Sequence, residues 1–319
     1  MNPTVVTNTC DSAASASEKA RVRMLADRGE PLFYANWDNA VFIHYEADPE
    51  ALQRCVPFPI DLYNGRSFVS IVAFTLRDMR PRLGGRISQW LVKPIATHHF
   101  FNVRTYVRHH GEVAIYFMAE WLSNRLSVAL GPTTFGLPYH FGKIDYANDG
   151  TGGEVHGRVR GKEGTFQYRA SLPDELTTCE PGSLIEFLLE RYTAFTSAGW
   201  RKQFFRVWHQ PWQQCSLDLE VSTDEVLATT GQWWQTAEFV SANYSPGVPV
   251  WMGWPHRVTS ESGRRARRNH RLGSSSAFRA SGILSGDTSG VLGLCFRPRA
   301  LEPHLSDPNR PRRGLRAGL

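Results

Sequence analysis

Between Leu32 and Val258 the sequence is a succession of short segments that are rich in aromatic and β-branched residues and are separated by turns. Residues of these types are typical of strands. The segment FFNVRTYV (100–107), for example, is followed by the loop RHHG and by EVAIYFMAEWL (112–122), a pattern that predicts a hairpin with a four-residue loop. Long strand–helix–strand crossovers are absent, so we expect an α+β chain whose sheet is mainly antiparallel and either curled or closed.

Three short helices are predicted among ten or more strands. The segment DPEALQRCV (48–56) begins with Asp48 as N-cap and Pro49 at the first helical position. The segment SNRLSVALG (123–131) begins at a Ser cap and is expected to stop at the following Gly-Pro pair. The segment GSLIEFLLERYTAFT (182–196) begins as an amphipathic helix. Further strands are expected at 62–76, 139–147, 153–161, 164–172, 202–212, 216–221, 235–244 and 248–255.

Composition divides the chain into three parts. Residues 1–30 are polar and without hydrophobic period, so we expect a mobile N-terminal arm. Residues 31–258 form the domain, and residues 259–319 form a tail with twelve Arg, no Lys and four acidic residues. Because the whole chain has a net charge of +6 and the tail a net charge of +8, the other 258 residues carry about −2. The domain itself is therefore not basic.

The Arg-rich tail has three interpretations that the sequence leaves open. It could bind a nucleic acid or a membrane surface. It could be a disordered extension, which its Ser, Gly, Arg and Pro content favours. It could also be an out-of-frame reading of a GC-rich gene, given its abrupt loss of pattern.

Several classes of protein are disfavoured. No apolar stretch is long enough for a membrane span and the N-terminus does not resemble a signal peptide, so we expect no membrane partner. The five Cys are scattered without metal-binding spacing, which favours reduced thiols in a cytoplasmic protein. Motifs for nucleotide binding, zinc hydrolysis or a nucleophilic Ser are missing, and we expect neither metal nor cofactor. Nucleic acid is not expected as a partner except through the tail, and the oligomeric state is open.

The segment FFNVRTYV offers candidate binding residues. Alternation along a strand places Asn102, Arg104 and Tyr106 on one face. In a curled sheet this row could line a cavity and hold a carboxylate, because the Arg guanidinium is a planar fork of donors. The alternative is a structural ion pair of Arg104 with Glu120 or Glu112 on the next strand.

Two other groups invite a functional and a structural interpretation. Glu186 and Glu190 stand one helical turn apart, as on a solvated helix face or in a paired-carboxylate acid/base site. His209 alternates with Trp208 and is expected to face the opposite way, as a packed histidine rather than a catalyst.

A series of segments, in order, resembles the YqjF-like uncharacterised family (domain of unknown function 2071) of the acetoacetate-decarboxylase-like superfamily. They are the Trp37 strand with HYEADPEALQRCVP, then DLYNGRSFVSIVAF, FNVRTYV, LPY, SLIEFLLERYTAF and YSPGVPVWMGWPHRV. The resemblance spans roughly Leu32 to Val258. It implies a cone-like antiparallel β-barrel, with short peripheral helices, around a small-molecule pocket.

The resemblance also implies where a nucleophile would stand. The decarboxylases use a Lys that forms a Schiff base, and this Lys follows a Gly-aromatic-Pro turn. The similar turn here is 136–138, which is followed by Tyr139 and His140, so the amine is missing. Lys143 is the only amine close by, and we interpret it as a surface group.

Three functions remain open on this basis. The first is an enzyme acting on a small carboxylate or carbonyl compound, with Arg104 as anchor and with Tyr139 and His140 as candidate acid/base groups. The second is a binding module that keeps the pocket but has lost the amine. The third is a structural or interaction protein whose interior is filled with aromatic side chains.

Overall fold

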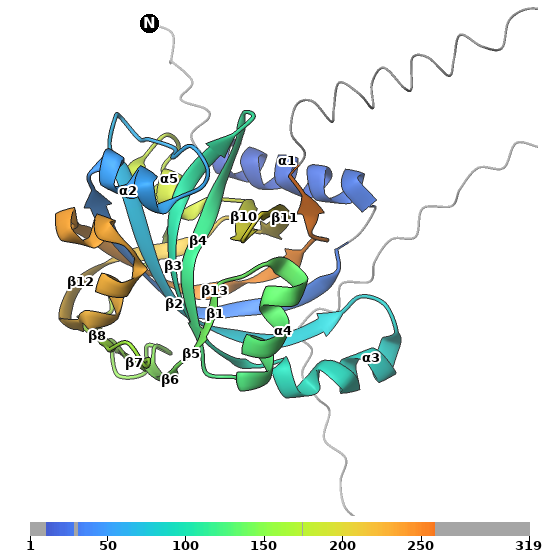
Figure 1. Cartoon of the computed structure of the whole chain (residues 1–319). Helices are drawn as coiled ribbons and strands as arrows, with labels where there is room; N and C mark the ends of the chain where they lie inside the picture. The colour runs from blue at the N-terminus through green and yellow to red at the C-terminus, as the bar shows by residue number, and fades with distance from the viewer. Residues whose placement is uncertain (1–10, 29–30, 174, 259–319) are drawn as a thin grey trace, which may run out of the picture. The chain divides into compact units, whose positions relative to one another are not determined.

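The computed structural model describes residues 11–28, 31–173 and 175–258 (Figure 1). The Arg-rich tail, 259–319, lies outside the described residues, and so do the predictions made for it. None of the helices in the described part of the chain is long and apolar enough to cross a membrane.

The described residues form one sheet of fourteen strands with helices around it. The strands are β1 Phe33–Ala47, β2 Ser67–Pro81, β3 His98–His109, β4 Glu112–Leu122, β5 Tyr139–Phe141, β6 Lys143–Ala147, β7 Glu154–Arg160, β8 Thr165–Ser171, β9 Thr177–Thr178, β10 Thr193–Ala198, β11 Arg201–His209, β12 Gln213–Asp224, β13 Glu238–Met252 and β14 His256–Arg257. The helices are α1 Asp11–Arg28, α2 Pro49–Cys55, α3 Gly85–Val92, α4 Arg125–Phe135 and α5 Leu184–Leu189, with 3-10 turns η1 Lys93–Ile95, η2 Glu225–Thr230 and η3 Gln232–Thr236.

Seven of these strands close into a ring. Their order is β11-β10-β4-β3-β2-β1-β13, and β13 returns to β11 through three pairs between 207–209 and 250–252. Pairing is antiparallel except where β4 meets β5 and β10. Beyond β13 the sheet continues through β12, β8, β7 and β6. The α+β, mainly antiparallel, closed architecture expected from the sequence is thereby confirmed.

Strand β2 shows why the sequences of the ring strands are apolar over long stretches instead of alternating with polar residues. Val69 and Ile71 on one face join a core with the sheet extension. Phe68, Val72 and Phe74 on the other face join a second core inside the ring. Because a strand alternates its faces, a strand buried on both sides must be apolar throughout.

Local signals in the sequence account for several element boundaries. Asp48 caps α2, since its carboxylate accepts from the Ala51 N–H at 2.8 Å. His110 and Gly111 both have positive φ, as a two-residue hairpin turn requires. The predicted four-residue loop was therefore too long, because His109 still pairs with Glu112.

Helix α4 differs from its prediction at both ends. It is capped by Asn124, whose side chain accepts from two backbone N–H groups at 3.0 Å. It continues through Pro132 to Phe135 and ends at Gly136, which has a φ of +68°. Around the proline the hydroxyl of Thr134 donates to the Leu130 and Gly131 carbonyls at 3.1 and 3.2 Å. The side chain thus supplies hydrogen bonds near the site where Pro removes a donor.

The structure divides or joins several other predicted segments differently. The expected strand 139–147 is two strands that separate at Gly142. The segment 182–196 begins with helix α5, as expected, but the helix ends at Leu189 and the last residues of the segment belong to β10. The strands expected at 235–244 and 248–255 are mainly the single strand β13.

Helix α1 occupies a segment that was expected to be a mobile arm. The Ser17 hydroxyl donates to the His209 carbonyl at 2.6 Å, and the Trp208 indole donates to the Ser17 carbonyl at 3.1 Å. Met24 is buried. The helix was missed because it packs through small side chains and one Met rather than through an apolar stripe.

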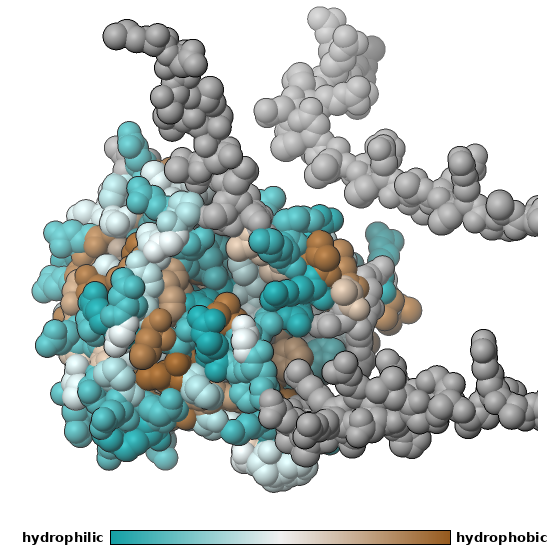
Figure 2. Space-filling view, turned by 90° about the horizontal axis from the view of Figure 1, so that it is seen from above, coloured by the Kyte–Doolittle hydropathy of each residue, from teal (hydrophilic) through white to brown (hydrophobic). Residues whose placement is uncertain are grey.

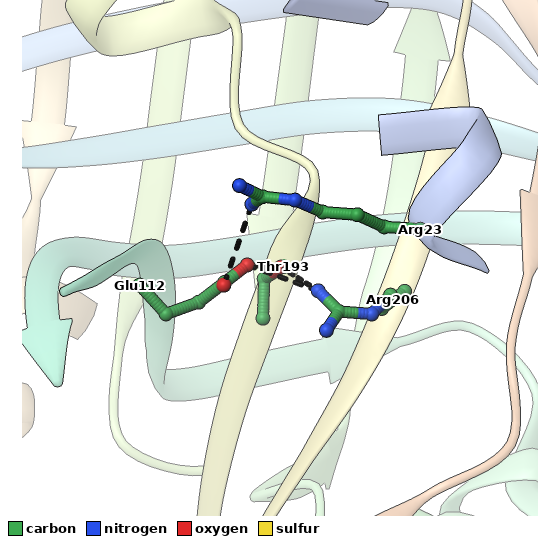
Figure 3. A network of polar contacts seen from close by, with 4 residues as sticks. All are labelled: Arg23, Glu112, Thr193 and Arg206. Carbon is green, nitrogen blue, oxygen red and sulfur yellow. Dashed lines mark hydrogen bonds and ion pairs between the residues drawn. The ribbon is translucent and has the colours of Figure 1, made fainter. Parts of the chain in front are cut away.

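A charged network joins α1 to three strands of the ring (Figure 3). Glu112 accepts from the Thr193 hydroxyl at 2.7 Å and from the Arg206 guanidinium at 3.0 Å. Arg23 of α1 reaches its other oxygen at 3.5 Å. The surface seen from above in Figure 2 is mainly hydrophilic, with hydrophobic side chains in small separate groups.

Candidate functional site

The seven-stranded ring encloses a cavity of about 530 Å³. Its lining comes from the inward faces of β1–β4, β10 and β11 and from α4, and it is mostly aromatic and aliphatic. Large side chains of this lining are Phe33, Trp37, Phe42, Phe74, Phe100, Phe117, Phe135, Phe205 and Trp212. A small set of polar groups interrupts this apolar surface, as in ligand sites generally.

Three buried polar side chains meet on β3 and β4. Asn102 and Arg104 alternate along β3, and Glu120 stands opposite Asn102 on β4. All three line the cavity and all three are less than 7% exposed. Asn102 Oδ1, Arg104 Nε and Glu120 Oε2 have no partner within the described protein. Buried polar atoms are normally paired, so three unpaired atoms in one cavity wall are unusual.

A β-bulge turns Glu120 into the cavity. The pairing of β3 with β4 shifts between Val103 and Arg104, so that Arg104 stands opposite Phe117 and Asn102 opposite Glu120. As a result, Phe117 and Glu120 both line the cavity although they are three residues apart. Strict alternation would have placed them on opposite faces.

The charge at this site is positive and uncompensated. Burial raises the pKa of Glu120 well above its usual range, and the nearby Arg104 only partly opposes this. The guanidinium of Arg104 stays charged although burial lowers its pKa. It donates to the Leu188 carbonyl at 3.4 Å and also interacts with the Tyr106 hydroxyl, and both of these partners are uncharged.

The structural alternative for Arg104 was an ion pair with Glu120 or Glu112. Within the described residues neither acid forms one with it, and Glu112 is engaged by Arg206 instead. The guanidinium also lies over the Phe42 ring, with its carbon 5.7 Å from the ring centroid.

Tyr139 joins the site from β5. It pairs with Glu120 across the parallel β4–β5 ladder and lines the cavity. Its ring lies against Gly131 of α4, where a Cβ would come within 2.1 Å of it, and forms an edge contact with Phe100. Burial, with a further contribution from Glu120, raises the pKa of Tyr139 well above its usual range, so the group is a neutral phenol.

The other two candidate residues lie elsewhere. Tyr106 does not line the cavity: its hydroxyl donates to the Leu188 carbonyl at 2.8 Å and contacts Ser70. His140 is exposed and stacks on Trp121, with 5.3 Å between ring centroids. Lys143 is also exposed, and none of the described residues that line the cavity is a lysine.

The two helical glutamates have structural partners. Glu186 accepts from the Gly182 N–H at 2.6 Å, at the start of α5. Glu190 is buried rather than solvated, and it accepts from the Trp212 N–H and the Tyr192 hydroxyl. They do not form a paired-carboxylate site.

His209 faces the cavity, opposite to Trp208, as alternation predicted. Its Nδ1 lies 2.7 Å from the Gln210 carbonyl, and burial lowers its pKa. In the part of the chain that the structure describes, no group of three or more His, Cys, Asp or Glu is arranged to hold a metal ion.

The fold has known neighbours. Acetoacetate decarboxylase from Legionella pneumophila superposes with a TM-score of 0.50 at 13% identity, covering 72% of this chain and 88% of that one. The enduracididine biosynthesis enzyme MppR, complexed with pyruvate, superposes with a TM-score of 0.51 at 14% identity, covering 72% of this chain and 91% of MppR. At these identities the likeness shows the fold alone.

Sequence comparison is more specific. The uncharacterised protein YqjF of Bacillus subtilis (strain 168) is 29% identical over 198 residues, which are 61% of this chain and 80% of YqjF. The model of the DUF2071 family, described as an uncharacterised conserved protein, matches residues 34–249. That match covers most of the ring, including Asn102, Arg104, Glu120 and Tyr139, and the chain belongs to the DUF2071 family.

Proposed function

We propose that the cavity binds a small carboxylate or carbonyl compound whose anionic group is held by Arg104. The single observation that carries this proposal is the buried, uncompensated guanidinium with an unpartnered Nε facing an enclosed space. A ligand carboxylate would complete a planar, charge-assisted pair there. The pyruvate complex of MppR supports the choice of ligand, since it places a small keto acid in a protein of this fold.

Asn102, Glu120 and Tyr139 surround the proposed anion. The unpartnered Asn102 Oδ1 is an acceptor, which suits a hydroxyl or protonated group of the ligand. Burial raises the pKa of Glu120 and so favours its protonated form, which can donate a hydrogen bond. An ionised Glu120 would instead repel the ligand and compete for Arg104.

A second candidate function is catalysis without a lysine. The observation that favours it is the pairing of Tyr139 with Glu120 at the cavity wall, where burial raises the pKa of both groups and favours the forms that carry a proton. Tyr139 would then act as acid toward a bound carbonyl. His140 has no part in this proposal, because its exposed ring stacks on Trp121.

Thermal shift with a panel of small carboxylates tests the binding proposal. A carboxylate present at 100 times its Kd should stabilise the protein by about 2.7 kcal/mol. Arg104→Met, which keeps the volume but removes the charge, should abolish the shift. Arg104→Lys keeps the charge but loses the planar fork, so we expect a reduced shift. An unchanged shift in Arg104→Met would exclude the anchor.

Two measurements separate binding from catalysis. Borohydride reduction in the presence of β-keto acids should give no covalent adduct in the cavity, since none of the described residues that line it is a lysine. If a bound carbonyl compound is turned over, Tyr139→Phe should lower kcat while the Kd changes little. Binding without turnover would favour the non-catalytic module.

A further inference from the structure

We infer that the ligand is a monocarboxylate with a long apolar chain, which runs from Arg104 to a hydrophobic mouth between α3 and α4. This inference rests on the proposed function and names its substrate class. It follows from how polarity and exposure change along the cavity.

The anchoring end of the cavity is closed. Arg104, Asn102 and Glu120 are almost fully buried, and Phe42 beside them is completely so. The strand β3 connects this end to the other: His98 and Arg104 both line the cavity and are six residues apart. At strand rise this separation is about 20 Å, which is far longer than a two- or three-carbon acid needs.

The other end of the cavity is open and apolar. Its lining includes two partly exposed side chains, Val92 at the end of α3 and Ile95 in η1, and the exposed Leu130 of α4. Helices α3 and α4 lie at the same end of the ring (Figure 1). His98 lines the cavity at this end, and burial lowers its pKa to about 4, so that it is neutral at pH 7.

Helix α3 carries exposed apolar side chains in addition to Val92, which lines the cavity. Ile87, Trp90 and Leu91 occupy one face of this helix and are 75%, 72% and 64% exposed. An apolar mouth would add nothing to the affinity for a small, fully hydrated acid. An alkyl chain, by contrast, loses water contact along the whole path from the mouth to the anchor.

Binding of straight-chain monocarboxylates from C4 to C12, measured by calorimetry below their micelle concentrations, tests this inference. The Kd should fall about fourfold for each added methylene, the factor that corresponds to about 0.8 kcal/mol. The fall should stop once the chain reaches the mouth. A 1-alkanol of equal length should bind more weakly, because it lacks the carboxylate. The affinity of dicarboxylates should not rise with chain length, because their second charge would lie in the apolar part of the cavity.

Two leucines of α4 provide a matched pair of variants. Leu130 lines the cavity and Leu126 does not, yet they are 44% and 48% exposed. Leu130→Glu should weaken binding of the C10 acid at least tenfold and leave the C4 acid unchanged. Leu126→Glu should change neither. Equal effects of the two variants would overturn the proposed path.

The outcomes also distinguish this inference from the function on which it rests. If all acids bind with one affinity that depends on Arg104, the anchor stands and the chain-length inference is wrong. If no acid of any length binds, the proposed function fails as well.

Discussion

At the scale of single residues, the protonation of Glu120 decides what the cavity can accept. Its pKa is raised by burial, so between the unfolded pKa, about 4.5, and the folded pKa the unfolded state releases a proton that the folded state keeps. Folding stability contributed by Glu120 is therefore full below pH 4.5 and falls as the pH rises toward the folded pKa.

We predict that Glu120→Gln becomes more stable relative to the natural protein as the pH rises from 4.5 to 8. The limit is about 1.4 kcal/mol per pH unit for one proton. Urea denaturation at several pH values measures the difference. If Glu120 were instead the ionised partner of Arg104, the Gln variant would be less stable at neutral pH, because it would leave a buried charge unpaired.

At the scale of elements, helix α1 is held by few contacts and should detach before the ring unfolds. Met24 is 3% exposed, whereas Val22, on the same helix, is 58% exposed. We expect Met24→Ala to make α1 sensitive to limited proteolysis and to lower the global Tm by only a few degrees. Truncating a buried Met to Ala in a core costs about 2–5 kcal/mol. Here the loss of global stability is smaller, because α1 can detach while the ring stays folded.

Val22→Ala is the control for this prediction, and its cleavage pattern should match that of the natural protein. Unchanged cleavage in Met24→Ala would show that the charged network around Glu112 suffices to hold the helix (Figure 3).

At the scale of the whole molecule, buried histidines should make the fold sensitive to acid. Burial lowers the pKa of His44 to about 3 and that of His98 to about 4. Below pH 6.5 the unfolded chain binds protons that these two folded residues do not, so stability is lost as the pH falls from 6.5 toward 4.

Between pH 6 and 4.5 the free energy of unfolding of the variant His98→Leu should fall less steeply with decreasing pH than that of the natural protein. The difference in slope should be about 1.4 kcal/mol per pH unit, which corresponds to one proton. Denaturant midpoints across this range measure the slope, and an identical slope in both proteins would contradict the prediction. The variant's stability at pH 7.5 controls for changes in packing against Phe100.

The sequence by itself determined the features that depend on neighbours in the chain. These are the strand character of the domain, the cap at Asp48, and the shared face of Asn102 and Arg104. All of them follow from local backbone geometry and side-chain alternation. The closed, mainly antiparallel fold also followed, because the strands are apolar and lack crossover helices.

Only the tertiary structure decided which polar groups meet in the cavity. The bulge in β4 turns Glu120 inward, and the parallel pairing of β5 with β4 places Tyr139 beside it. Docking on β11 converts a polar segment into helix α1. Each outcome depends on strand register or on contacts between residues far apart in sequence, which no local pattern encodes. The candidate anchor was therefore visible in the sequence, whereas its uncompensated charge was visible only in the folded chain.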